Sequence, residues 1–244
     1  MTGPERQTPA PRPGDPISRL AGLCPVPDPV IVDGGANKGR ITDRFLALFP
    51  GCRVAAFEPL PELARKLEKR FAADPRVTVR AQALGPEPGT ASLMVLSRRT
   101  LSSVLPPTGI HDKYAGQTLR ETARIKVPVV RLDAALPGGA DIVKLDLQGY
   151  ELAALRGALG ILPRVRLILA ETAFLPLYAG QPLFSELRNF LSARGFGFEG
   201  LYDPFFDKNG TLVSGDALFT AGPRAEAGRA PLGRSRPGRA LTRE

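Results

Sequence analysis

An acidic residue ends the first apolar run of this chain, and a glycine-rich turn follows it. The run Val30–Asp33 is β-branched and apolar until its last residue, and Gly34–Gly39 contains three glycines. A short apolar run bounded by a turn is typical of a buried strand. Glycines at such a turn allow sharp bends and leave room for a ligand beside the main chain. The first N–H groups of the next helix would face the same space. The stretch therefore predicts a nucleotide-sized pocket at the carboxyl end of a first strand.

The spacing of the glycines bears on which nucleotide fits. A dinucleotide-binding loop has the pattern Gly-x-Gly-x-x-Gly, which lets a pyrophosphate rest on the helix N-terminus. That register requires glycine at 34, 36 and 39, but the middle position is Ala36. The carboxylate of Asp33 would also repel a phosphate and attract a cation. The loop thus favours a ligand with an adenosine at one end and a positive charge at the other, which describes S-adenosylmethionine. The alternative is an ordinary glycine-rich turn without a ligand.

Two further segments fit the adenosine half of such a ligand. Glu58 ends a second predicted strand at 53–58, where an acid can accept hydrogen bonds from both ribose hydroxyls. An exposed glutamate before a helix would look the same in isolation. Ala83 and Leu84 follow a third predicted strand at 77–81, where the chain would pass the adenine edge.

A candidate for the chemistry itself stands further along the chain. Asp146 ends a strand-like run at 141–146, and Gln-Gly follows before a predicted helix. This carboxylate could act as general base on a hydroxyl, or hold the substrate or cofactor. Glu171 ends the next predicted strand and could face the same cleft. Together the two acids could chelate a hard divalent ion, but two carboxylates alone do not make a metal site, so no metal is predicted. Glu151, just inside the helix, would complement the helix dipole.

The single histidine of the chain, His111, is a second candidate for removing a proton. It lies in the stretch 97–124, which is polar and shows no periodicity that assigns it to a helix or strand. A histidine in such a loop is more often a surface residue, so Asp146 is the first choice for this role.

Strands and helices alternate along most of the chain. Predicted strands cover 30–33, 53–58, 77–81, 90–96, 125–132, 141–146 and 165–171; predicted helices cover 39–49, a segment beginning at Pro59 and Pro61, 150–159 and 183–194. Residues 196–202 and 217–220 would close the chain as a hairpin. This order predicts an α/β fold with a doubly wound, mostly parallel sheet and a C-terminal antiparallel hairpin. Its site would lie at the strand carboxyl ends.

Length and composition suit one such domain with extensions. The 244 residues are 43% apolar, enough for a full core. We expect a flexible leader at 1–29, in which 17–23 could form a short docking helix, a domain at 30–221, and a disordered Arg-rich tail at 222–244. The net charge is +9, but the tail holds six arginines against two glutamates. The domain itself is thus only weakly basic, and a nucleic-acid partner is not expected.

The chain carries no sign of a membrane or secretory protein. No run approaches the roughly 18 apolar residues that span a bilayer, and the N-terminus lacks the apolar region of a signal peptide. Two cysteines and one histidine argue against a disulfide framework or a zinc site. A cytoplasmic location without a membrane partner is therefore expected.

An ordered series of short motifs resembles the FkbM family of S-adenosylmethionine-dependent methyltransferases. The series is Asp-Gly-Gly-Ala-Asn-Lys-Gly (33–39), Phe-Glu-Pro (57–59), Ala-Leu-Gly (83–85), Val-x-Arg-Leu-Asp (129–133), Lys-Leu-Asp-Leu-Gln-Gly-Tyr-Glu (144–151) and Gly-Asp-Ala-Leu-Phe (215–219). Each motif is modest alone, but the set occurs in order and with the family's spacing between residues 30 and 221. Gly34 departs from the pattern, because the family more often has an aliphatic residue there.

The resemblance implies a class I, Rossmann-like methyltransferase that binds S-adenosylmethionine. It places the cofactor along a set of residues named in chain order: Asp33, Gly34, Gly35, Ala36, Asn37 and Gly39 at the methionine end, Glu58 and Pro59 at the ribose, Ala83 and Leu84 at the adenine, and Ser102 and Ser103 nearby. Asp146 would stand at the active-site strand end. Family members methylate hydroxyl oxygens on sugars, polyketides or other metabolites, so the resemblance implies a small hydroxylated acceptor.

Two other classes of protein remain open from the sequence. Enzymes that methylate the amino groups of bases carry an Asn/Asp-Pro-Pro-aromatic motif to grip a flipped base, whereas residues 147–150 here are Leu-Gln-Gly-Tyr. A non-catalytic scaffold would use its tail for partners, but the intact acids Asp33, Glu58 and Asp146 argue against a decayed site. An NAD-dependent oxidoreductase is excluded by the glycine register.

Overall fold

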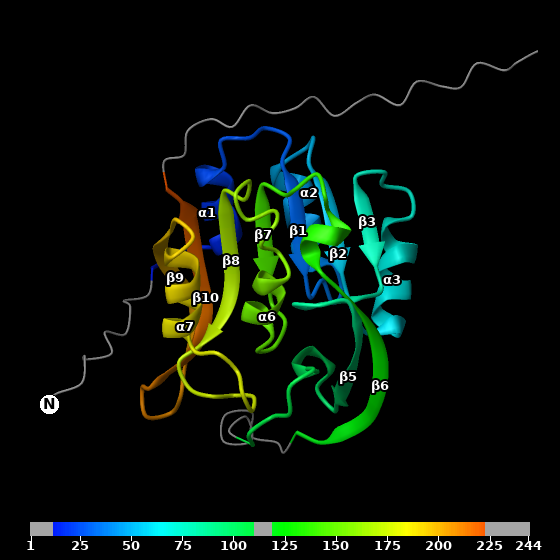
Figure 1. Cartoon of the computed structure of the whole chain (residues 1–244), viewed down its shortest axis with the longest axis vertical. Helices are drawn as coiled ribbons and strands as arrows, with labels where there is room; N and C mark the ends of the chain where they lie inside the picture. Colours follow the sequence, from blue (N-terminus) through cyan, green and yellow to red (C-terminus); the bar gives the residue numbers. More distant parts are fainter. Residues whose placement is uncertain (1–11, 110–118, 223–244) are drawn as a thin grey trace, which may run out of the picture.

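The computed structural model describes residues 12–109 and 119–222, and a seven-stranded sheet runs through it (Figure 1). Its spatial order is β3-β2-β1-β7-β8-β10-β9. The strands are β1 (Val30–Gly34), β2 (Arg53–Phe57), β3 (Val77–Arg80), β7 (Ile142–Leu145), β8 (Leu167–Ala173), β9 (Phe196–Phe206) and β10 (Leu212–Ala221). The first five in spatial order are parallel, and β10 is antiparallel to both β8 and β9. The predicted fold class is confirmed, including the closing hairpin.

Helices cover both faces of this sheet, because its strands are apolar on both sides. They are α1 (Pro16–Leu23), α2 (Arg40–Leu48), α3 (Pro61–Phe71), α5 (Leu132–Ala135), α6 (Glu151–Arg156) and α7 (Phe184–Ser192). Ile31 of β1 packs among residues of α1 and α2, whereas its neighbour Val32 packs among residues of α6 and α7. No helix within the described ranges is long and apolar enough to cross a membrane.

The predicted leader segment 1–29 contains a helix. Residues 16–23 form α1, which the sequence had allowed as a short docking helix, and Ile17 and Leu20 are fully buried in the core. Asp15 caps the helix by accepting a 2.8 Å hydrogen bond from the Ser18 amide, and Pro16 occupies a first-turn position. The division of the chain into leader, domain and tail otherwise stays a prediction, since residues 1–11 and 223–244 lie outside the described residues.

A second, three-stranded sheet stands beside the first, with the order β4-β6-β5. It comprises β4 (Ala83–Leu84), β5 (Gly89–Leu96) and β6 (Glu121–Val130). The strands predicted at 90–96, as an antiparallel strand, and at 125–132 are thus confirmed, and they pair antiparallel with each other. Strand β6 begins within the stretch that the sequence left unassigned. Leu93 and Val127 of this sheet pack against α3 and the turn before it. This places the segment after β5 beside the carboxyl edge of the main sheet.

Helix α6 ends at Arg156 and is therefore shorter than the helix predicted at 150–159. Gly157 follows, and a Cβ at this position would lie 2.0 Å from the Gly85 carbonyl oxygen. The backbone therefore passes directly against the turn after β4, which fixes that turn at the edge of the site.

Candidate active site

The loop between β1 and α2 is pressed between neighbouring elements. Gly35 has φ +74°, and a Cβ there would lie 2.0 Å from the Asp146 carbonyl oxygen. Gly39 has φ +78°, and its Cβ would lie 2.7 Å from the Phe71 ring. Asn37 also has positive φ, which asparagine tolerates better than most residues. The two glycines therefore allow β7 and α3 to approach the loop.

Asp33 lies beneath this loop and does not line the cavity described below. It is fully buried; its Oδ2 accepts a 2.7 Å hydrogen bond from Thr42 Oγ1, and its Oδ1 lies 3.3 Å from Lys144 Nζ. Burial alone would lower the pKa of Lys144, but the carboxylates of Asp33 and Asp146 outweigh it and raise that pKa. The carboxylate expected to attract a cationic ligand thus neutralises a buried lysine instead.

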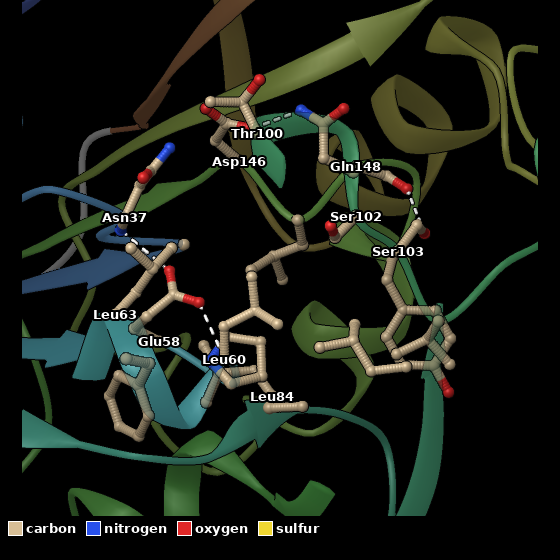
Figure 2. A pocket seen from close by; sticks show the side chains of 18 of the residues that line it. Asn37, Glu58, Leu60, Leu63, Leu84, Thr100, Ser102, Ser103, Asp146 and Gln148 are labelled. Carbon is tan, nitrogen blue, oxygen red and sulfur yellow. Dashed lines mark hydrogen bonds between the residues drawn. The ribbon is translucent and has the colours of Figure 1, made fainter. Parts of the chain in front are cut away.

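Glu58 stands at the end of β2 with its side chain turned towards the glycine loop (Figure 2). Its Oε2 accepts a 2.9 Å hydrogen bond from the Asn37 amide, and its Oε1 accepts another, also 2.9 Å, from the Leu60 amide. The side chain is only 5% exposed, and this burial raises the pKa of Glu58 although the two amides oppose the effect. Each oxygen keeps a lone pair for a further donor.

A cavity opens at the carboxyl edge of the sheet. Of the residues predicted from the sequence, it is lined by Gly35, Asn37, Glu58, Pro59, Ala83, Leu84, Ser102, Ser103 and Asp146. Leu60, Leu63 and Leu93 add an apolar wall next to Leu84. The cavity therefore joins an apolar slot, a buried carboxylate acceptor and an open carboxylate in one space.

Four predicted residues do not reach the cavity: Asp33, Gly34, Ala36 and Gly39. Strand alternation turns Asp33 away, and Gly34 faces the side chains of Leu145 and Leu84. These residues shape the loop from behind. His111 lies outside the described residues.

Asp146 follows β7 and leaves 44% of its side chain exposed. Its Oδ1 accepts a 2.7 Å hydrogen bond from Gln148 Nε2, and the same nitrogen donates, also at 2.7 Å, to Glu171 Oε2. Glu171 thus lies close to Asp146 and is joined to it through Gln148, but it is not among the residues that line the cavity, so the expectation that it faces the cleft stays a prediction. An amide donor lies between the two acids, and no three His, Cys, Asp or Glu side chains of the described segments are arranged to hold a metal ion.

The turn from β7 to α6 is held by Glu151. This side chain is buried, and its Oε1 accepts hydrogen bonds from the amides of Leu147 and Gly149, at 2.7 and 3.2 Å. Burial raises the pKa of Glu151 to about 7. The sequence predicted only that Glu151 complements the helix dipole. In the structure it also holds the turn on which Asp146 stands.

Sequence reasoning did not single out two residues of this region, Gln148 and Asp216. Asp216 of β10 lies in register with Glu171 of β8, and burial raises the pKa of Asp216 to about 7. The pairing between β8 and β10 joins positions 45 residues apart in the chain, so periodicity could not reveal it. Gln148 could have been noticed only as a polar residue in the turn after Asp146.

The fold and the cavity together define a class of protein. A doubly wound sheet with β10 inserted antiparallel between β8 and β9, a glycine loop after β1, a glutamate ending β2 and an aspartate after β7 is the arrangement of class I methyltransferases.

Comparison with known proteins gives the family. The profile described as "Methyltransferase FkbM domain" matches residues 33–198, and the chain belongs to this methyltransferase family. The 2-O-methyltransferase NoeI of Sinorhizobium fredii (strain NBRC 101917 / NGR234) is 29% identical over 175 residues, which cover 67% of this chain and 71% of NoeI. The crystal structure of the methyltransferase FkbM from Methylobacillus flagellatus KT matches 84% of this chain with a TM-score of 0.55 and 18% identity. The chain spans about half, 48%, of that protein.

Proposed function

We propose that this methyltransferase transfers the methyl group of S-adenosylmethionine to a hydroxyl oxygen of a small metabolite, such as a sugar or a polyketide. One observation carries the proposal: Glu58, which follows β2, and Asp146, which follows β7, line the same cavity (Figure 2). A carboxylate that can accept two hydroxyls and a carboxylate that can accept a proton are the two groups such a transfer requires.

The residues of the cavity fit the cofactor that the family implies. Glu58 is buried and keeps free lone pairs, which suits the paired hydroxyls of a ribose. The apolar slot of Leu60, Leu63 and Leu84 suits a flat base. Asp146 and Asn37, whose amide also donates to Glu58, offer polar groups to the charged amino-acid end. When bound, S-adenosylmethionine supplies a methyl group on a positively charged sulfur, which an acceptor oxygen displaces.

In this proposal the chain contributes alignment and proton removal. Close alignment of two reactants alone can supply a large part of a barrier reduction. Asp146 is half-exposed to the cavity and receives a donor from Gln148 on one oxygen only. Its Oδ2 lies 3.9 Å from Lys144 Nζ and remains able to accept the hydroxyl proton as the new bond to oxygen forms. The name of NoeI, a 2-O-methyltransferase, supports oxygen as the receiving atom.

The first test is calorimetric titration of the purified full chain with S-adenosylhomocysteine, with NAD and with a short RNA. Micromolar binding of S-adenosylhomocysteine without heat from the other two is the expected result. Radiolabelled methyl transfer to a panel of sugars, polyketides, amines and RNA then identifies the accepting atom. No binding of S-adenosylhomocysteine, or transfer only to amines or RNA, would contradict the proposal.

A further inference from the structure

Gln148 lines the cavity, and its side chain connects three other side chains. Its Nε2 donates to Asp146 and to Glu171, and its Oε1 accepts a 2.7 Å hydrogen bond from the Tyr178 hydroxyl. The residue has φ +53°, a left-handed conformation that is uncommon for glutamine. Such strain persists only where surrounding contacts hold it, and it often marks a functional position.

Two hydrogen bonds hold the backbone on either side of this residue. The backbone oxygen of Gln148 accepts a 2.7 Å hydrogen bond from Ser103 Oγ (Figure 2). Glu151 accepts from the next amide, that of Gly149. The turn is therefore clamped from both sides, by the segment after β5 and by the first residue of α6. The position of the Gln148 side chain is set before any ligand arrives.

Tyr178 fixes which way the amide points. It is 1% exposed, and its hydroxyl has one proton, which has two acceptors within reach: Gln148 Oε1 at 2.7 Å and the Leu101 carbonyl oxygen at 3.0 Å, so the shorter contact is to Gln148. Burial, together with the nearby carboxylates of Glu171 and Glu151, raises the pKa of Tyr178, so the hydroxyl keeps this proton. When the proton occupies this shorter contact, the amide oxygen of Gln148 faces Tyr178, and the carboxylate oxygens of Asp146 and Glu171 favour the same orientation because they accept from Nε2. The NH₂ group must then face Asp146 and Glu171, which is the orientation observed.

The orientation of the Gln148 amide affects the carboxylate of Asp146, the proposed base. Titratable groups face Asp146 from every neighbouring element: Lys144 on β7, paired with Asp33 of β1, and three acids, which are Glu151 of α6, Glu171 of β8 and Asp216 of β10. Burial, together with the nearby Asp146 carboxylate, holds the pKa of Glu171 well above its usual range. Without a donor between them, two adjacent carboxylates repel or share a proton. The Gln148 amide supplies this donor and leaves the second oxygen of Asp146 to the cavity.

We propose that Tyr178 and Gln148 are positioning residues, which together hold the Asp146 carboxylate at the cavity in the orientation that accepts the acceptor's proton. This inference rests on the proposed function. It assigns Tyr178, which does not line the cavity, a contribution to turnover that acts entirely through Gln148. It also predicts that a substitution at Tyr178 or Gln148 lowers the rate of turnover but leaves cofactor binding nearly unchanged.

The first experiment needs neither cofactor nor acceptor. The chain has five glutamines, so ¹⁵N-glutamine labelling gives five side-chain amide signals, and Q148A assigns one of them. In Tyr178→Phe the Gln148 amide signals should move and broaden, because the orienting donor is gone. In the control Tyr202→Phe, which alters another buried tyrosine, they should stay in place. Unchanged Gln148 signals in Tyr178→Phe would overturn the inference, whether or not the proposed function holds.

The second experiment uses the best hydroxylated acceptor from the methyl-transfer screen. Tyr178→Phe and Gln148→Glu should lower kcat about 10–100-fold, within the contribution of a positioned base, with KM for S-adenosylmethionine changed less than about 2-fold. Gln148→Glu replaces the donor by another acid, so the acidic limb of its kcat profile should move up by about one pH unit. If Tyr178→Phe does not fold, the near-isosteric Gln148→Glu carries the test. Unaltered kcat and pH profile would overturn the inference, whereas absent S-adenosylhomocysteine binding by the unchanged protein overturns the proposed function.

Discussion

Replacing Glu58 offers the sharpest test of how the cavity binds its ligand. Glu58→Ala removes both carboxylate oxygens from a site where the side chain is only 5% exposed. Any ribose hydroxyls bound there lose a charged acceptor, and the amides of Asn37 and Leu60 lose their partner as well. A hydrogen bond to a charged group contributes about 1.5–3 kcal/mol, and part of this loss falls on the protein itself. We therefore expect binding weaker by about 1–3 kcal/mol, which is roughly 5–150-fold in Kd.

The assay is calorimetric titration with S-adenosylhomocysteine, with Glu62→Gln as the matched control. Glu62 is an exposed acid on α3 that pairs with Lys66 and Arg99, and its loss should change Kd by less than about 2-fold. The pH dependence has a definite sign. Burial raises the pKa of Glu58, so as pH falls its carboxylate takes up a proton at a higher pH than an ordinary glutamate does. The affinity for S-adenosylhomocysteine should decline as the pH falls through that pKa. Equal Kd values for Glu58→Ala and the unchanged protein would refute the assignment of Glu58 to the ligand.

Two further predictions concern stability. Lys144→Met leaves the Asp33 charge buried without its cationic partner, so the free energy of unfolding should fall by about 3–5 kcal/mol in urea denaturation. Adding Asp33→Asn should restore part of the loss, and no restoration would mean that packing alone matters. Burial raises the pKa of Asp216 from 3.8 to about 7, so the folded chain holds a proton that the unfolded chain releases, and stability should fall as pH rises through this window. The variant Asp216→Asn should lack this contribution to the pH dependence. In differential scanning calorimetry it should melt at a higher temperature than the unchanged protein at pH 8 but not at pH 4. The same difference in melting temperature at both pH values would contradict the prediction.

Local sequence determined the elements and the order of the site. A β-branched run, an acid and a glycine turn can form only a few backbone arrangements, so β1 and the loop after it were predictable from Val30–Gly39. The same holds for Glu58 and Asp146, because each directly follows an apolar strand. In a parallel sheet, residues at the carboxyl ends of neighbouring strands meet at one edge. The convergence of these two acids on one cavity was therefore predictable without contacts.

Tertiary structure decided which of these residues face the cavity. Asp33 belongs to β1, but the register of β1 with β7 places it opposite Lys144, and that pairing turns it into an internal counter-ion. Register is set by contacts between residues more than 100 positions apart, which no local pattern records. The same reason hid the register of Glu171 with Asp216 and the reach of Tyr178 to Gln148. The sequence determined by itself which groups stand at the edge of the sheet, and only the packed chain decided which of them line the cavity, which hold the loops around it, and which are neutralised inside.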